Sequence, residues 1–153
     1  MHFIITGNEQ ETIELGMKLG RLLIPGDFVA LMGELGTGKT RFVKGVAAGL
    51  EVDPNLPVTS PTYSILHIHQ GRLPLFHFDL YRLRGGEDVD ELGFVEFFYG
   101  DGVSLVEWAE RLQSEMPKES LTITIYHLGA DKRRIEFTPA GKRYEELVMS
   151  LFQ

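Results

Sequence analysis

The sequence predicts an α/β protein built as a three-layer sandwich around a mixed β-sheet. Apolar, strand-like runs alternate with helical patterns in the first part of the chain, which is typical of parallel strands joined by helices. Two pairs of strand-like runs, over 62–80 and 121–138, are joined by short turns and add antiparallel hairpins. A mixed sheet covered by helices on both faces accommodates both observations.

The first elements in the chain have clear local signals. HFIIT (2–6) is strand-like, and Asn8 with Glu11 three residues later resembles a capping box that opens a helix over about 9–23. The apolar residues of that helix recur at helical spacing and are expected in the core: Ile13, Met17, Leu19, Leu22 and Leu23. A Pro-Gly turn then leads into a buried strand over 27–32. After the next loop, apolar residues at helical spacing predict a helix that ends near Gly49.

The remaining elements follow a polar, proline-rich loop over 51–61. Strands are expected over 62–70 and 73–80, joined at Gly71-Arg72, and short helices over 85–98. A further strand over 102–108 precedes a short helix over 109–116. The second hairpin and a terminal helix over about 140–151 complete the chain. We expect residues 1–153 to form one domain, since nothing in the pattern resembles a linker.

Composition limits the possible functions. The chain is 43% hydrophobic and 24% charged, which is ordinary for a globular protein, and its apolar runs are too short for a membrane span. It has no cysteine, so disulfides, thiolate nucleophiles and cysteine metal sites are excluded. The net charge of −7 argues against direct tight binding to nucleic acid, although it leaves room for a local basic patch. With no signal peptide pattern, we expect a cytoplasmic location.

The loop GELGTGKT (33–40) has the phosphate-binding pattern G-x-x-x-x-G-K-[ST]. A strand precedes it and a helix follows, as the P-loop NTPase fold requires, so a chance match is the weaker interpretation. Backbone amides of the loop and of the helix N-terminus would point at the phosphates, and glycines would let the backbone approach them closely. Lys39 would reach the β- and γ-phosphates, and the Thr40 hydroxyl would bind Mg²⁺.

Two acidic residues follow apolar strands and could complete such a site. Asp79 ends LPLFHFD and Glu107 ends GVSLVE, where a P-loop enzyme carries a carboxylate that holds Mg²⁺ or its water. Each could instead be a solvated acid at a strand end. His67, His69 and His77 are read as ordinary strand residues, because no cysteine or H-E-x-x-H helix supports a zinc site. Trp108, the single tryptophan, directly follows Glu107 and could report on the site.

ATP is the expected nucleotide. An N-K-x-D segment, with which GTPases read guanine, is absent, and DELG (90–93) follows an acidic stretch in place of an apolar strand. A small-molecule kinase remains an alternative, with Arg82 and Arg84 as candidate lid residues, but no acceptor site can be assigned. A nucleotide-gated interaction module with negligible hydrolysis is a third interpretation.

GELGTGKT, SPTYS (60–64), HFDLYRL (77–83) and LVEW (105–108), in this order and spacing, resemble the bacterial TsaE (YjeE) family. The resemblance covers nearly the whole chain and implies a small P-loop ATPase required for threonylcarbamoyladenosine in tRNA. It implies that Glu107 helps hold Mg²⁺ and that Asp79 is needed for hydrolysis. The residues it implies for nucleotide binding are Gly33, Leu35, Gly36, Thr37, Gly38, Lys39, Thr40, Thr62 and Trp108, with Glu9 and Lys132 near the adenine.

The same resemblance implies protein partners. TsaE-like proteins bind a complex of TsaD and TsaB, which handles the tRNA and the threonylcarbamoyl-adenylate intermediate. ATP hydrolysis would reset that complex between turnovers, and the rate of the isolated protein would be low. An acidic surface is compatible with such docking, and contact with tRNA would be indirect.

Overall fold

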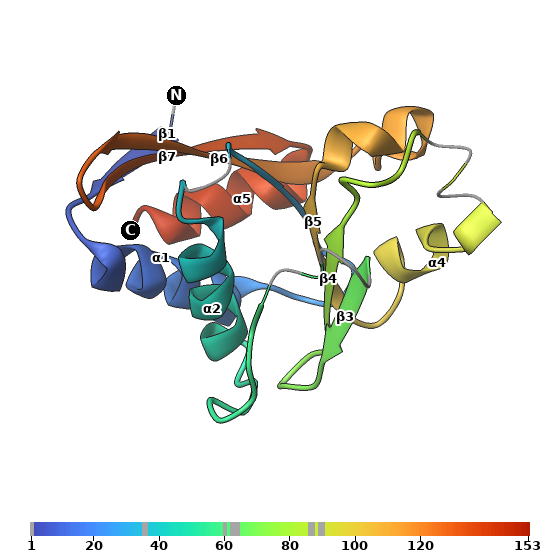
Figure 1. Ribbon diagram of the computed structural model, residues 1–153, viewed down its shortest axis with the longest axis horizontal. Coiled ribbons are helices and arrows are strands. Elements are labelled where there is room, and N and C mark those ends of the chain that lie inside the picture. The colour runs from blue at the N-terminus through green and yellow to red at the C-terminus, as the bar shows by residue number, and fades with distance from the viewer. Residues whose placement is uncertain (1, 35–36, 60, 62–64, 86–87, 89–90) are drawn as a thin grey trace.

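A mixed seven-stranded sheet forms the middle layer of the protein (Figure 1). The computed structural model describes residues 2–34, 37–59, 61, 65–85, 88 and 91–153. The strands are β1 (His2–Thr6), β2 (Phe28–Met32), β3 (Leu66–His69), β4 (Leu75–Asp79), β5 (Val103–Glu107), β6 (Ser120–Gly129) and β7 (Lys132–Ala140). The helices are α1 (Glu9–Leu22), α2 (Lys39–Gly49), α4 (Val95–Phe98), the 3₁₀ helix η1 (Ala109–Glu115) and α5 (Lys142–Leu151).

The strand order is β1-β7-β6-β2-β5-β4-β3. The four central strands β6, β2, β5 and β4 run parallel to one another, as expected for strands joined by helical crossovers. The hairpins β3–β4 and β6–β7 are antiparallel, and β1 pairs antiparallel with β7 at the edge. The predicted mixed sheet and both predicted hairpins are confirmed.

Helices cover the sheet on two sides, which confirms the three-layer sandwich. α1, α2 and α5 pack on one face, in a core that includes Leu19, Phe42 and Leu147. α4 and η1 cover the other face of β2, β5 and β4, around Phe28 and Phe78. Figure 1 shows the two groups of helices on opposite sides of the sheet. Along the ranges the structure describes, no helix is both long and apolar enough to cross a membrane.

α1 and α2 cross in direct backbone contact through glycines. A Cβ added to Gly16 or Gly20 of α1 would run into the carbonyl oxygens of Phe42 or Val46 in α2. Gly45 and Gly49 of α2 meet α1 in the same way. The four glycines therefore let the two helices approach more closely than side chains would permit.

This contact corrects part of the predicted core. Leu19 and Leu23 are fully buried, but Ile13 and Met17 are half-buried, and Leu22 only packs against the core. The predicted core face was based on large apolar residues alone. It therefore omitted the glycines of α1, although they form the stripe that faces α2.

The short helix predicted over 109–116 is confirmed, and the structure specifies its type. Ala109–Glu115 forms a 3₁₀ helix, interrupted at Gln113, which has φ 49° and ψ −121°.

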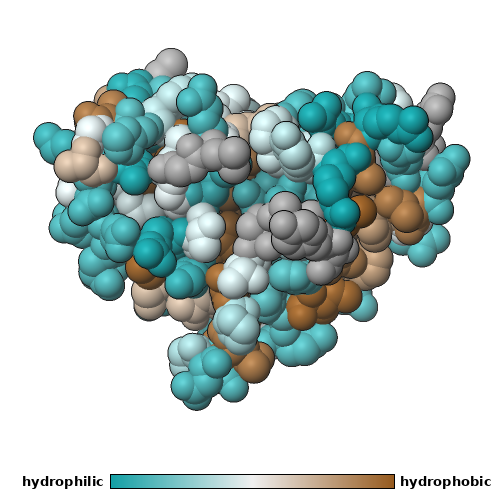
Figure 2. All heavy atoms as spheres, viewed as in Figure 1, coloured by the Kyte–Doolittle hydropathy of each residue, from teal (hydrophilic) through white to brown (hydrophobic). Residues whose placement is uncertain are grey.

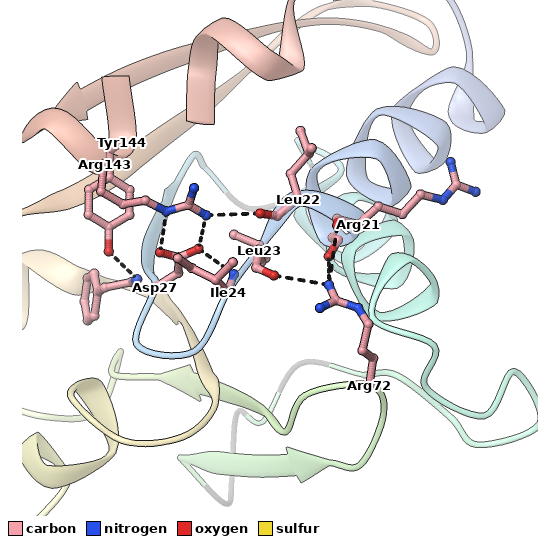
Figure 3. Close-up of polar contacts among 10 residues, drawn as sticks. Arg21, Leu22, Leu23, Ile24, Asp27, Arg72, Arg143 and Tyr144 are labelled. Atoms are coloured by element: carbon pink, nitrogen blue, oxygen red, sulfur yellow. Dashed lines mark hydrogen bonds and ion pairs between the residues drawn. The ribbon is translucent and has the colours of Figure 1, made fainter. Parts of the chain in front are cut away.

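An ion pair between buried Asp27 and half-buried Arg143 ties α5 to the turn before β2 (Figure 3). Arg143 donates to both carboxylate oxygens of Asp27, at 3.0 and 2.7 Å, and to the Leu22 carbonyl at 3.0 Å. Asp27 also accepts the Ile24 amide at 2.8 Å, and the Tyr144 hydroxyl accepts the Phe28 amide at 2.8 Å. One carboxylate, 3% exposed, thus organises the turn before β2 and the start of α5.

Arg143→Met should destabilise the fold, because it leaves the Asp27 carboxylate buried without its cation. Breaking a fully buried pair from one side costs about 3–5 kcal/mol, and the partial exposure of Arg143 reduces the expected loss to about 2 kcal/mol. Urea denaturation followed by circular dichroism measures it. Lys142→Met, at the exposed neighbouring position of α5, is the control, and equal losses for the two variants would refute the role of the pair.

Candidate nucleotide site

The glycine-rich loop connects β2 to α2, as its sequence pattern requires. Gly33 has φ +147° and Gly38 has φ +100°, conformations that other residues rarely adopt. A Cβ on Gly33 would also lie 2.8 Å from the Thr37 hydroxyl oxygen and 3.0 Å from the Ile125 carbonyl oxygen. The Thr37 hydroxyl donates to the Glu34 carbonyl at 2.7 Å, which closes the loop on itself. Leu35 and Gly36 lie outside the described residues.

The N-terminus of α2 suits an anion. Gly38 is its N-cap without a side chain to accept from the first amides, and no acidic residue stands in the first turn. The N–H groups of this first turn carry the positive end of the helix dipole, which favours a phosphate. Lys39 opens the helix and is buried, with 8% of the residue exposed, while Thr40 is exposed.

The two predicted acids lie side by side at the same edge of the sheet. Asp79 and Glu107 are register partners at the ends of the parallel strands β4 and β5, and β5 is also the neighbour of β2. Both are buried, at 6% and 5% exposure. The Glu107 Oε1 atom lies 3.6 Å from Lys39 Nζ, so an acid and the loop lysine face each other across the site.

Glu107 has a second basic neighbour, His77. The His77 Nε2 atom lies 2.7 Å from Glu107 Oε2. Burial acts to raise the pKa of Glu107, but the hydrogen bond and charge of His77, together with Lys39, outweigh it, so that the pKa lies below its ordinary value. Asp79 accepts the Tyr81 amide at 3.0 Å. Hydrogen bonds from other groups of the protein therefore hold both carboxylates in place, which does not happen for a solvated acid at a strand end.

Trp108 directly follows β5 and packs over the site. Its backbone is left-handed, with φ 60° and ψ 40°. The indole ring contacts Tyr81 edge to face, with the centroids 4.9 Å apart. The cationic groups of Lys39 and Arg111 each lie 5.6 Å from its centroid. This contact with the loop lysine supports Trp108 as a reporter of the site.

The β6–β7 hairpin reaches the loop through Arg133. The Arg133 Nε atom donates to the Thr37 carbonyl at 2.5 Å, and its Nη1 atom donates to the Ala130 and Lys132 carbonyls at 2.9 Å. Lys132, the residue nominated from the sequence, is exposed, and its neighbour makes the contact with the loop.

The other nominated positions are placed in part. Glu9, at the start of α1, is exposed, and its Oε1 atom lies 3.5 Å from Arg41 Nε in the first turn of α2. The start of α1 therefore lies beside the start of α2. Thr62 lies outside the described residues.

The oxygen donors present fit Mg²⁺. Magnesium prefers oxygen ligands, keeps several waters and needs only one or two protein groups beside the phosphates. The Thr40 hydroxyl and the Glu107 carboxylate are such groups. No cluster of three or more His, Asp or Glu side chains that could bind a metal occurs within the described residues, so a closed all-protein metal cage is not seen there.

Sequence reasoning missed two residues of this site. His77 stands two residues before Asp79 on the same strand and therefore faces the same side, a spacing that could have linked it to the acids. Arg133 is 96 residues from Thr37, and only the pairing of the hairpin with β2 brings it to the loop. No local signal marks it.

The chain is similar to several proteins in sequence and structure. A family model described as Threonylcarbamoyl adenosine biosynthesis protein TsaE matches residues 6–135. The tRNA threonylcarbamoyladenosine biosynthesis protein TsaE of Bacillus subtilis (strain 168) is 42% identical over 147 residues, 95% of this chain and 90% of that protein. The protein of the same name from Treponema pallidum (strain Nichols) is 43% identical over 131 residues, 86% and 96%. A crystal structure of Bacillus subtilis YdiB superposes with a TM-score of 0.85 at 39% identity, covering 99% of this chain and 93% of that one.

Arg133→Ala should loosen the loop, because the Thr37 carbonyl loses a charge-assisted hydrogen bond. Such a bond contributes about 1.5–3 kcal/mol, so amide exchange at Thr37, Gly38 and Lys39 should accelerate about tenfold or more. Hydrogen exchange followed by NMR measures it. Lys132→Ala, at the exposed neighbour, is the control, and equal exchange in the two variants would contradict the contact.

Proposed function

Since this chain belongs to the TsaE family, we propose that it acts in the biosynthesis of threonylcarbamoyladenosine in tRNA as a magnesium-dependent ATPase. The observation that carries the ATPase assignment is the convergence of three parts at one sheet edge. The glycine-rich loop follows β2, and the buried carboxylates Asp79 and Glu107 end the parallel strands beside it. A loop that binds phosphate next to two fixed acids suits hydrolysis of a phosphoanhydride.

The proposed chemistry is in-line attack of water on the γ-phosphate, catalysed by positioning and electrostatics. The amides of the loop and of the α2 N-terminus bind the phosphate oxygens, and Lys39 stabilises charge on the β- and γ-phosphates. Thr40 and Glu107 would hold Mg²⁺, which would neutralise negative charge on the phosphates. Asp79 orients the attacking water, and the fixed position of its carboxylate beside Glu107 supports this role.

The proposed partners are TsaD and TsaB, the proteins that the TsaE resemblance implies. In this proposal they handle the tRNA, this chain meets tRNA only through them, and hydrolysis resets their complex between turnovers. The net charge of −7 supports docking to protein surfaces over phosphate backbones. The face seen in Figure 2 is largely hydrophilic, with hydrophobic residues in several separate places. The proposal places the protein in the cytoplasm, together with the tRNA.

The partner proposal predicts that phosphate release from ATP is slow for the isolated protein and strongly stimulated by the TsaD–TsaB complex. A colorimetric phosphate assay, with and without the complex, tests this. A phosphorylated metabolite in place of free phosphate would indicate a kinase. Partner binding that depends on the nucleotide, without hydrolysis in the complex, would indicate an interaction module.

Lys39→Ala should weaken ATP binding about tenfold or more, because the loop loses its charge-assisted contact with the phosphates. Trp108 fluorescence or calorimetry measures the affinity in the presence of Mg²⁺. Lys44→Ala, an exposed lysine on the same helix, is the control. Unchanged ATP affinity in the Lys39 variant would contradict the phosphate-loop assignment.

Asp79→Asn should leave ATP affinity nearly unchanged and lower the turnover rate about 10²–10⁴-fold, the range for loss of a group that positions or activates the nucleophile. Stimulated phosphate release and nucleotide titration are measured on the same protein. Asp101→Asn, in the exposed loop before β5, is the control. Retained turnover would move the catalytic role to another residue.

A further inference from the structure

His77 lies in the middle of β4 and faces the candidate site. Its side chain is 2% exposed, and its Nε2 atom lies 2.7 Å from Glu107 Oε2. Its two neighbours in the strand, Phe76 and Phe78, point to the opposite face, where they pack against Phe97. Sequence reasoning treated His77 as an ordinary strand residue, but it is the closest basic contact of an acid at the candidate magnesium site.

The direction of this hydrogen bond follows from the chemistry of the two groups. A carboxylate oxygen has no proton to give, so Glu107 Oε2 accepts and His77 Nε2–H donates across the 2.7 Å contact. The other ring nitrogen, Nδ1, is buried without a hydrogen-bond partner in the described part of the chain. An unpaired buried ring nitrogen is unfavourable, so His77 carries a cost here that an apolar side chain would avoid.

The contact fixes the rotation of the Glu107 carboxylate. Its terminal torsion has a broad minimum, so packing alone leaves the two oxygens free to turn. His77 holds Oε2 on the β4 side, and Oε1 is thereby turned toward Lys39, 3.6 Å away at the start of α2. Oε1 is thus presented to the phosphate loop.

We propose that His77 is a positioning residue, which orients the Glu107 carboxylate for the divalent cation of the nucleotide site. This inference rests on the proposed function, because it assigns the cation to Glu107. Outer groups that orient a metal-binding side chain change metal affinity about 10–100-fold when they are removed. His77 is expected to act in this range and to have little effect on nucleotide affinity without metal.

The test compares two substitutions of similar size. The amide of His77→Gln can place a donor near the position of Nε2, whereas His77→Asn is too short to reach Glu107. ATP affinity is titrated through Trp108 fluorescence, in EDTA and over a range of Mg²⁺ concentrations. His77→Asn should raise the Mg²⁺ concentration that gives half of the maximal change in ATP affinity about 10–100-fold. His77→Gln should bring this concentration most of the way back to the wild-type value. Affinity in EDTA should stay within about twofold for both.

His69→Gln is the matched control. His69 lies on the same sheet face, is buried and has a buried Nε2 without a partner in the described residues. If substituting a buried histidine only disturbed the sheet, His69→Gln would change the Mg²⁺ dependence of ATP affinity as well. If the contact with Glu107 is responsible, His69→Gln should leave that dependence unchanged. Thermal unfolding of each variant confirms that the compared proteins are folded.

A second measurement uses the protein without nucleotide or metal. Long-range ¹H–¹⁵N NMR of the imidazoles should find His77 protonated at Nε2, with a resonance that shifts in Glu107→Gln. Equal Mg²⁺ dependence in His77→Asn and wild type, or a His77 proton at Nδ1, would overturn the inference and leave the proposed function intact. Wild-type ATP affinity that does not depend on Mg²⁺ would overturn both.

Discussion

The parallel pairing of β2, β5 and β4 is the constraint on which the candidate site depends. Parallel neighbours end at the same edge of a sheet, so the loop after β2 and the acids that end β5 and β4 must meet there. A parallel sheet also needs cover on both faces, which explains why α4 and η1 are present opposite α1 and α2. The hairpins extend this parallel centre on both sides, and the β6–β7 hairpin carries Arg133 to the loop.

The position of α2 is set from two directions. Its start is fixed by the loop and by Arg133, whereas its body is fixed by the glycine contact with α1. At Gly45 and Gly49 backbone lies against the backbone of α1, so a side chain at either position would force α2 away from α1. At the far end of the sheet, Asp27 and Arg143 fix where β2 begins. The glycine-rich loop therefore lies between β2 and α2, and other contacts hold both of these elements in place. This arrangement favours a preformed site.

The sequence was sufficient for features that local patterns encode, and insufficient for those that depend on distant contacts. Strands, hairpins, the loop–helix junction and the two acids followed from periodicity and spacing, and the structure places the acids together. Arg133 could not be found, because its contact with Thr37 spans 96 residues. The core face of α1 was partly wrong, since glycines carry no apolar signal. The assigned roles of the site residues, and the single domain, stay predictions.

The charges at the site explain why the proposed reaction needs a metal ion. Glu107 and Asp79 are adjacent buried acids, and Glu107 is stabilised there by Lys39 and His77. A bound triphosphate would draw Lys39 toward its own oxygens and place further negative charge beside Glu107. Glu107 would hold Mg²⁺ here, and its charge would offset the resulting repulsion, which is strong in a buried site. On the proposed function, metal and nucleotide therefore stabilise each other at this site, and the orientation of Glu107 decides how strongly they do so.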